Sequence, residues 1–272
     1  MGDLVSVIIP FFNEEKYLKD TIKSILNQTY ENIEILLIND NSTDSSLEIC
    51  KSFNDSRIKI YTKKDKIKGA ASSRNMAIDL AKGNFAAVQD ADDIAHPERI
   101  AKQLNKAKEN PSKLIVGTWI KKVDKKETLV KLPIENRDII KGFRRSYNRV
   151  TFVAGTLFCS SEILRRFRYR EKIHYVEDLD LLQRLYEDGR YEFNNIPEYL
   201  YTYYIRNKGS KAKPDWIDYN YFQRNCQKRR LKGENEFENI EEFKKYLSSN
   251  RYQNLRWTIF RYLDKARLKT FG

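Results

Sequence analysis

Short apolar runs alternate with segments of helical periodicity through the first 116 residues of the chain. Each run is apolar at consecutive positions, as in strands that are buried on both faces. Between the first two runs, Leu18, Ile22 and Ile25 recur at helical spacing. The alternation predicts an α/β fold with a mostly parallel central sheet that is flanked by helices. The five runs are Val5–Pro10, Ile33–Ile38, Ile58–Tyr61, Phe85–Gln89 and Leu114–Gly117.

Polar clusters follow three of these predicted strands, at the point where each strand ends. They lie in Asn13–Glu15, Asn39–Asp44 and Asp90–Asp93. Ligands of open α/β sheets bind in the crevice beyond the carboxyl ends of the strands. We therefore expect the three clusters to line one crevice.

The pattern is less regular after residue 117, and residues 123–148 show no clear periodicity. A helix that carries Leu181 and Leu185 is expected to end at Gly189, because glycine commonly terminates helices. The other elements predicted in this part are a buried strand over Thr151–Cys159, a helix over Ser161–Arg166, a strand over Glu198–Arg206 and a final helix over Tyr246–Lys269.

The chain is strongly basic, with 51 Lys and Arg against 38 Asp and Glu, a formal net charge of +13. This surplus favours anionic partners: nucleotide phosphates, nucleic acids or an acidic membrane surface. No stretch approaches the roughly 20 apolar residues of a membrane-spanning helix. The three cysteines stand far apart in the sequence, which is typical of free thiols in a reducing compartment. We therefore expect a cytoplasmic protein.

The cluster Asp90-Ala91-Asp92-Asp93 places three carboxylates within four residues. Such carboxylates repel one another, and a hard divalent cation with oxygen ligands would neutralise them. Mg²⁺ commonly uses one or two carboxylates together with substrate phosphates, which suits so short a motif. The alternative is a solvated loop that caps the helix beginning near Pro97.

Two further residues flank the expected crevice. Asp40 follows the second strand, where its carboxylate can accept the N–H of a nucleobase or ribose hydroxyl groups. Arg74 opens a helix and can contact the base or the diphosphate, or pair with an aspartate. The alternatives are a turn or cap residue for Asp40 and a surface arginine for Arg74.

Glu177 and Asp178 open the helix that precedes Leu181. A carboxylate at this place can act as a general base, although acidic residues also favour the first turn of any helix. The chain lacks the motifs of several other enzyme classes. It has no phosphate-binding GxxxxGK[ST] loop, no GxGxxG after the first strand and no zinc-type Cys/His spacing. With only two histidines, a Ser-His-Asp hydrolase is improbable.

Four signals occur in one order along the chain: VSVIIPFFNE, ILLINDNSTD, GAASSRNMAIDLAKGNFAAVQDADD and YVEDLDLLQRL. As a set they closely resemble glycosyltransferase family 2, over about residues 4–206. The resemblance implies the Rossmann-like GT-A fold and an inverting, metal-dependent transfer of a sugar from a nucleotide sugar. It also implies a uridine diphosphate donor and Mn²⁺ or Mg²⁺ as the cofactor.

The resemblance also implies residue roles. The second strand's signature usually has two aspartates, of which Asn39 replaces the first and Asp40 is the second, base-contacting one. Asp178 matches the catalytic base. The nucleotide site would comprise Pro10, Phe11, Asn13, Asp40, Arg74 and Asp90, the metal site Asp92 and Asp93, and the acceptor side Glu177, Gly155 and Thr156.

Two departures limit this likeness. Gln183-Arg184-Leu185 is not the QxxRW signature of processive synthases, so a non-processive enzyme is expected. No histidine follows Asp178, so the third, histidine metal ligand of some GT-A enzymes is missing, and the metal would depend on the diphosphate.

We predict a GT-A domain over residues 1–206, with a nucleotide-binding half at 1–116 and an acceptor and catalytic half at 117–206. A basic helical extension would follow at 207–272. The expected acceptor is a hydroxyl of a glycan or lipid-linked glycan in bacterial lipopolysaccharide or capsule synthesis, and the basic extension could rest on an anionic membrane.

Two other functions are considered for this sequence. A catalytically inactive GT-A-like protein would only bind glycans. A basic nucleic-acid-binding protein would explain the charge but not the carboxylate cluster, which would repel phosphate, so we expect no nucleic-acid partner.

Overall fold

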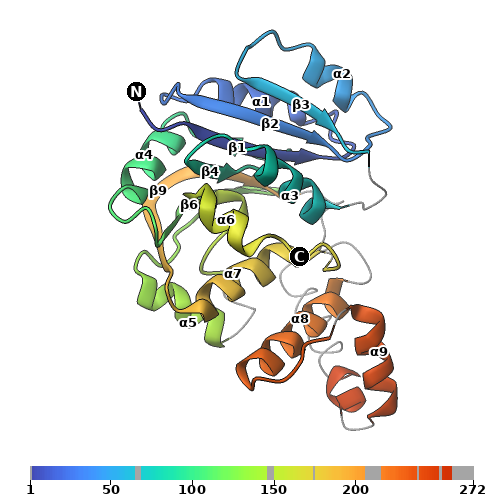
Figure 1. Cartoon of the computed structure of the whole chain (residues 1–272). Helices are drawn as coiled ribbons and strands as arrows, with labels where there is room; N and C mark the ends of the chain where they lie inside the picture. Colours follow the sequence, from blue (N-terminus) through green and yellow to red (C-terminus); the bar gives the residue numbers. More distant parts are fainter. Residues whose placement is uncertain are drawn as a thin grey trace. The chain divides into compact units, whose positions relative to one another are not determined.

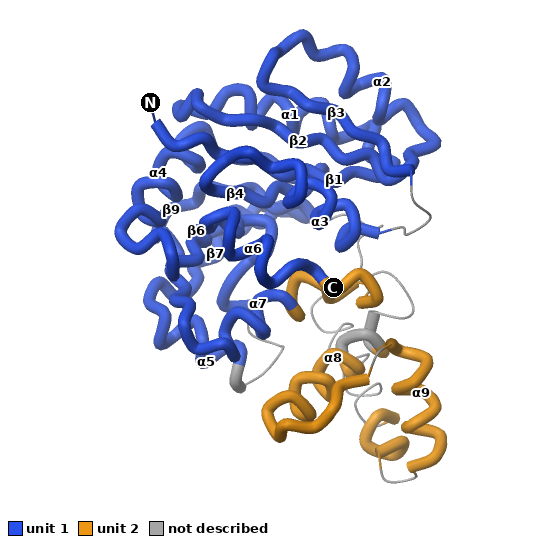
Figure 2. The backbone as a smooth tube through the Cα atoms, viewed as in Figure 1, with its two compact units in different colours: residues 1–169, 181–205 blue, residues 170–180, 206–272 orange. Residues whose placement is uncertain are grey.

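The computed structural model describes residues 2–64, 69–145, 150–173, 175–205, 216–237, 239–250 and 253–258. The chain forms two compact units (Figure 2). The first unit comprises residues 1–169 and 181–205, and the second comprises 170–180 and 206–272. The second unit thus takes in eleven residues, 170–180, from the half of the chain to which we assigned catalysis.

A mixed sheet of nine strands, counted over the described residues, forms the centre of the first unit (Figure 1). The strand order is β3-β2-β1-β4-β8-β6-β9-β5, and β7 pairs with β6 off this path. The strands are β1 (Val5–Phe11), β2 (Ile33–Asn39), β3 (Ile58–Thr62), β4 (Phe85–Val88), β5 (Ile94–Ala95), β6 (Leu114–Val123), β7 (Glu127–Val130), β8 (Phe158–Ser160) and β9 (Glu192–Tyr204).

The first four strands of this order pair in parallel, as do β6 and β9. The short strands β8 and β5 pair antiparallel with their neighbours. The predicted α/β class with a mostly parallel sheet between helices is confirmed.

Helices bury both faces of the sheet. On one face, Leu18 and Ile22 of α1 (Leu18–Leu26) and Leu104 of α4 (Arg99–Ala107) share a core with alternate strand residues such as Val7 and Ile35. On the other face, α3 (Ala70–Leu80), α6 (Ser161–Phe167) and residues 181–185 of α7 (Glu177–Asp188) pack on the intervening strand residues. The remaining helices of this unit are α2 (Ser46–Lys51) and α5 (Asn136–Arg145). Burial on both faces explains why the strands are apolar at consecutive positions.

Thr151–Cys159 was expected to form one buried strand, and this expectation was wrong. A 3₁₀ turn, η1 (Ala154–Thr156), precedes the three-residue strand β8. The turn is stabilised locally, because the backbone N–H and the hydroxyl of Thr156 both donate to the carbonyl of Val153, at 2.9 and 2.7 Å. Residues 123–148, in which the sequence shows no clear periodicity, contain β7 and α5.

The second unit has its own apolar core. Helices α8 (Trp216–Leu231) and α9 (Ile240–Ser249) pack through Phe222, Cys226 and Phe243. The final helix predicted over Tyr246–Lys269 was wrong in its bounds: α9 begins earlier and ends at Ser249, because Asn250 adopts an extended backbone. A further helical stretch covers residues 253–258, and residues 259–272 lie outside the described part. None of the described helices has the length and apolarity needed to cross a membrane.

Candidate active site

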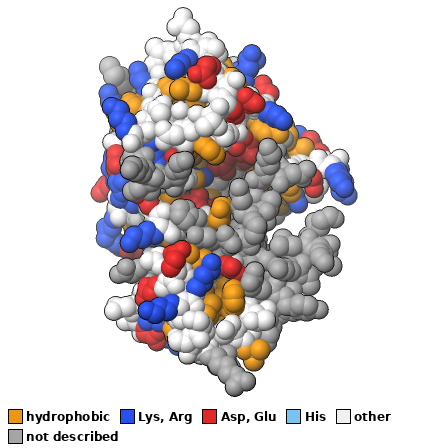
Figure 3. Space-filling view, turned by 90° about the vertical axis from the view of Figure 1, so that its right-hand side faces the viewer, with side chains coloured by type: hydrophobic (Ala, Val, Ile, Leu, Met, Phe, Trp, Pro, Cys, Tyr) orange, Lys and Arg blue, Asp and Glu red, His pale blue; other side chains and the backbone are white. Residues whose placement is uncertain are grey.

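The strand register brings the ends of β1, β2 and β4 to one edge of the sheet. Phe11 of β1 is aligned with Asn39 of β2, and Ile8 of β1 is aligned with Val88 of β4. The polar residues after these strands line a cavity of about 230 Å³. On the face of the molecule that Figure 3 shows, acidic side chains gather in a recess. The cavity is lined by Pro10, Phe11, Phe12, Glu14, Asp40, Ala70, Ser73, Arg74, Asp90, Ala91 and Asp92.

Asp40 is held at the base of this cavity by two donors. Its Oδ1 accepts a hydrogen bond from Nζ of Lys63 at 2.9 Å, and its Oδ2 accepts one from the backbone N–H of Gly69 at 2.7 Å. Gly69 has φ of 121°, a conformation that favours glycine. Lys63 also donates to the hydroxyl of Ser72 at 2.5 Å. Asp40 is therefore a fixed, charge-balanced acceptor.

Asn13, which we assigned to the nucleotide site, braces two loops. Its Oδ1 accepts from the backbone N–H of Thr43 at 2.8 Å, and its own N–H donates to the hydroxyl of Ser42 at 3.1 Å. Asn13 has φ of 55°, which asparagine tolerates better than most residues. These bonds tie the end of β1 to the loop after β2, so Asn13 shapes the cavity without being among its lining residues.

Asp90, Asp92 and Arg74 form a second charged part of the cavity lining. Nη2 of Arg74 donates to Oδ1 of Asp90 at 3.0 Å, and Arg74 lies in the first turns of α3, whose amino-terminal residues Ala70 and Ser73 also line the cavity. A helix amino terminus attracts anions. A diphosphate could therefore bind between this helix end and the carboxylates, provided that a cation screens the carboxylates.

A divalent metal fits the donor chemistry of this wall only in part. Asp90 and Asp92 supply carboxylate oxygens, the ligands that Mg²⁺ and Mn²⁺ prefer. Within the described ranges, no three His, Cys, Asp or Glu side chains are grouped to hold an ion by themselves. The residues thus suit a metal that takes its remaining ligands from a bound diphosphate and water.

Asp93, which we assigned to the metal site, has its carboxylate in the core. It is fully buried, and it accepts hydrogen bonds from the hydroxyl of Tyr201 and the backbone N–H of Tyr204, both at 2.8 Å. Burial, with the charges of Asp90 and Asp92, raises the pKa of Asp93 to about 9. The geometry favours a role in which Asp93 anchors residues 90–93, hereafter the acidic loop, to the end of β9.

Arg99 is a functional candidate that the sequence analysis missed. Its side chain is fully buried beneath the acidic loop, where burial lowers the pKa of the guanidinium to about 10. It lies over the ring of Tyr201, 5.0 Å from the centroid. It donates to the carbonyls of Val88 and Gly155 at 2.7 and 3.1 Å, and to the side-chain oxygens of Gln89 and Gln103 at 2.7 and 2.9 Å. Arg99 therefore joins β4, η1 and α4 under the cavity.

Gly155 and Thr156, which we assigned to the acceptor side, support the acidic loop from within the fold. A Cβ atom added at Gly155 would lie 2.7 Å from Oδ2 of Asp90 and 2.6 Å from the hydroxyl of Tyr201. Thr156 is fully buried, and its carbonyl accepts from Nε2 of Gln103 at 2.7 Å. Only glycine lets the 3₁₀ turn approach the carboxylate of Asp90 so closely.

Glu177 and Asp178 lie in the first turn of α7, in the part of that helix that belongs to the second unit. The backbone N–H of Leu179 donates to Oδ1 of Asp178 at 2.7 Å. Glu177 is largely buried. The meeting of Asp178 with the cavity of the first unit stays a prediction.

Comparison with known proteins agrees with this architecture. The sequence model of Glycosyl transferase family 2 matches residues 6–173, more than half of the chain. An uncharacterized glycosyltransferase of Methanocaldococcus jannaschii is 32% identical over 210 residues, which are 75% of this chain and 72% of that protein. A UDP-Glc:α-D-GlcNAc-diphosphoundecaprenol β-1,3-glucosyltransferase of Escherichia coli is 42% identical over 103 residues, but the match spans only 38% of this chain and 41% of the enzyme.

The fold is also similar to that of a solved enzyme. A mannosyltransferase from Pyrobaculum calidifontis, in complex with GDP-mannose and Mn²⁺, superposes with a TM-score of 0.62 and 16% identity. The match covers 96% of this chain and 75% of that one. The expected GT-A type of fold is confirmed.

Proposed function

The chain belongs to glycosyl transferase family 2, and we propose that it transfers a sugar from a uridine diphosphate donor to a hydroxyl of a lipid-linked glycan. The observation that supports this proposal most strongly is the cavity at the ends of β1, β2 and β4. It combines a fixed acceptor, Asp40, with carboxylates and an arginine at the amino end of α3. These are the groups that a nucleoside diphosphate needs for its base, its phosphates and its metal.

The base of the donor is inferred from Asp40. The fold does not decide it, since the solved mannosyltransferase of the same fold was crystallised with GDP-mannose. A carboxylate has about four lone-pair sites, and Lys63 and Gly69 use two of those on Asp40. The others can accept the imide N–H of uracil.

Asp40→Asn should weaken the binding of UDP by about 10- to 100-fold, which corresponds to the loss of one hydrogen bond to a charged group. The amide also removes the negative charge that balances the buried Lys63. Isothermal titration calorimetry with UDP measures the effect. The matched control is Asp79→Asn, which breaks an exposed pair with Arg168 and should leave the affinity for UDP unchanged. Equal affinity in Asp40→Asn and the wild type would remove Asp40 from the nucleotide site.

The diphosphate would lie between Arg74 and the acidic loop. When bound, a Mg²⁺ or Mn²⁺ ion held by Asp92, with Asp90 beside it, would neutralise the charge that builds on the departing nucleoside diphosphate. Arg74 would orient the carboxylate of Asp90 and contact a phosphate oxygen. Arg99 and Gly155 keep this loop in place from below.

The transfer would proceed by a single displacement. Asp178 would take the proton from the acceptor hydroxyl as its oxygen bonds to the anomeric carbon. The bond from that carbon to the diphosphate oxygen would break at the same time, so that the anomeric configuration is inverted. Glu177 lies beside Asp178 and would help to bind the acceptor.

The acceptor class is inferred from the similar enzyme of Escherichia coli, whose name gives a GlcNAc-diphosphoundecaprenol acceptor. We extend this to a role in bacterial surface polysaccharide synthesis, at the inner face of the membrane. The basic stretch from Arg206 to Lys232, with nine Lys and Arg against two acids, would attract the anionic lipid surface where such an acceptor resides.

A panel of UDP-, GDP- and dTDP-sugars, incubated with Mn²⁺ and a GlcNAc-diphospho-lipid acceptor, tests the function. We expect release of UDP and a new glycolipid with one added sugar, of inverted anomeric configuration by NMR. A glycan-binding protein without catalysis would release no nucleotide from any donor. A nucleic-acid-binding protein would do the same and would bind DNA or RNA in a gel-shift assay.

A further inference from the structure

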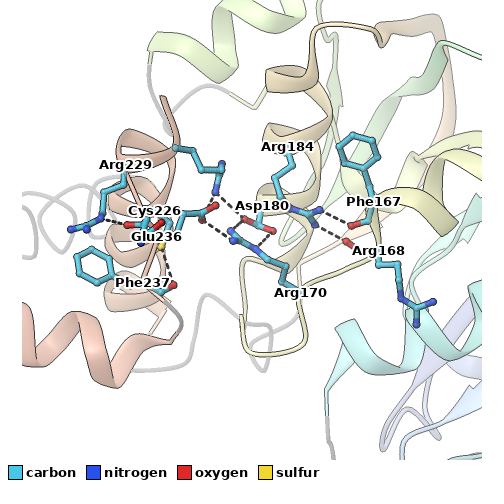
Figure 4. A network of polar contacts seen from close by, with 11 residues as sticks. Phe167, Arg168, Arg170, Asp180, Arg184, Cys226, Arg229, Glu236 and Phe237 are labelled. Carbon is cyan, nitrogen blue, oxygen red and sulfur yellow. Dashed lines mark hydrogen bonds and ion pairs between the residues drawn. The ribbon is translucent and has the colours of Figure 1, made fainter. Parts of the chain in front are cut away.

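A network of ion pairs links Arg170 and Asp180, which lie before and after Asp178 in the sequence, to Glu236 (Figure 4). Arg170 makes two hydrogen bonds to Asp180, one from Nε to Oδ2 at 2.9 Å and one from Nη2 to Oδ1. Its Nη1 donates to Oε2 of Glu236 at 2.7 Å, and Nη1 of Arg230 donates to the same oxygen at 2.6 Å. Arg230 also lies 3.9 Å from Oδ1 of Asp180. All four side chains belong to the second unit.

The charges of this network compensate one another around one fully buried carboxylate, and the side chain of Arg170 is 30% exposed. The side chain of Asp180 is fully buried, and those of Arg230 and Glu236 are 17% and 22% exposed. Removing an arginine partner leaves the buried charge of Asp180 with less compensation, which is unfavourable. Two arginines and two carboxylates sum to zero, so the segment 170–180 is held against α8 and the chain after it as long as all four are present.

The same segment fixes the position of Asp178. Asp180 is two residues beyond Asp178, and its backbone N–H donates to the carbonyl of Val176 at 3.0 Å. Val176 and Ile173 are buried in the core that contains Phe222 and Phe243. Contacts with residues of the second unit therefore hold the chain both before Asp178, at Ile173 and Val176, and after it, at Asp180.

We propose that the C-terminal unit is a positioning device for the catalytic base, and that Asp180 and Arg170 are its central positioning residues. This inference rests on the proposed function, in which Asp178 accepts the proton of the acceptor hydroxyl. The charge network gives the C-terminal helices a role in the chemical step, separate from any contact with a membrane. A general base that is misplaced by about 1 Å can cost about 10²-fold in rate.

The test compares Asp180→Asn with Asp79→Asn in the full chain. Asp79→Asn is the matched control, because it breaks an exposed arginine pair in the other unit. For Asp180→Asn we expect kcat to fall about 10²-fold, the dissociation constant for UDP to stay within about twofold, and hydrogen exchange of the amides of residues 176–180 to increase. The control should change none of these.

A second variant, Arg170→Lys, guards against a simple loss of folding. Lysine keeps the charge but cannot make paired bonds to Asp180 while also bonding Glu236, so we expect a folded protein with a smaller loss of kcat and unchanged binding of UDP. Unchanged kcat in Asp180→Asn, or a loss of UDP affinity as large as the loss of kcat, would overturn the inference.

Failure of the proposed function gives a different result. The wild type would then turn over none of the sugar donors, and the exchange measurement would still decide whether the network orders residues 176–180. Unchanged exchange in Asp180→Asn would overturn the positioning role by itself.

Discussion

Asp178→Asn lowers kcat by about 10²–10⁴-fold and leaves the affinity for UDP nearly unchanged, because a general base contributes about this factor and does not touch the nucleotide. Asparagine has almost the same shape as aspartate, and its side-chain oxygen can still accept the hydrogen bond from the N–H of Leu179. The negative charge and the ability to take up a proton are lost. The variant therefore separates proton transfer from the local structure of α7.

The measurement is the rate of UDP release at saturating donor and acceptor, together with UDP titration of the same preparations. Asp188→Asn is the matched control, since it removes a partly exposed ion pair with Arg190 at the other end of α7 and should keep full activity. A loss of nucleotide binding that parallels the loss of kcat, or full activity in Asp178→Asn, would show that Asp178 is not the base.

Arg99→Met lowers the free energy of unfolding by about 3–5 kcal/mol, because each buried acceptor that is left without its donor costs about 1–3 kcal/mol. Methionine fills much of the volume but donates no hydrogen bond. The carbonyls of Val88 and Gly155 and the side-chain oxygens of Gln89 and Gln103 would lose their donor inside the core. The stacking on Tyr201 would also be lost.

Urea denaturation followed by circular dichroism measures this loss. Arg137→Met, at a side chain that is 82% exposed, is the control and should change the free energy of unfolding by less than about 0.5 kcal/mol. An effect of Arg99→Met as small as that of the control would mean that neighbouring groups or water satisfy the acceptors of Arg99.

The strands β1 and β2, which are buried on both faces, were predicted to within one residue, because continuous apolar runs between helices leave few alternatives. The bounds of β3, a partly exposed strand at the edge of the sheet, also differ from the prediction by only one residue. The pairing of β6 with β9 could not be predicted, since it joins residues about 80 positions apart and its register shifts around Thr118 and Trp119. Pro197 lies opposite this shift and has no N–H to donate.

The residues that line the cavity were easier to predict than the buried residues that hold them in place. Asp40, Asp90 and Asp92 follow strands that end at one edge, so their meeting follows from topology alone. Arg99 was missed because a charged residue in the first turn of a helix usually faces solvent. Its spacing from Gln103, four residues later and beside the apolar stripe of Ile100 and Leu104, is the signal that could have found it.

The second unit could not be predicted from the order of elements along the sequence. Residues 170–180 lie between segments of the first unit in sequence, yet they pack with α8 and α9. The ion pairs of Arg170 with Glu236 and of Asp180 with Arg230 join residues 66 and 50 positions apart, and they leave no periodic pattern in the sequence.

The central claim is that the acidic cavity holds a nucleoside diphosphate through a divalent metal. Calorimetric titration of UDP into the wild type and Asp92→Asn, with Mn²⁺ and with EDTA, tests it most directly. We predict that Mn²⁺ tightens the binding of UDP by at least about tenfold in the wild type and has no such effect in Asp92→Asn. Binding of UDP that is the same with and without Mn²⁺, or a metal effect that survives in Asp92→Asn, would contradict the claim.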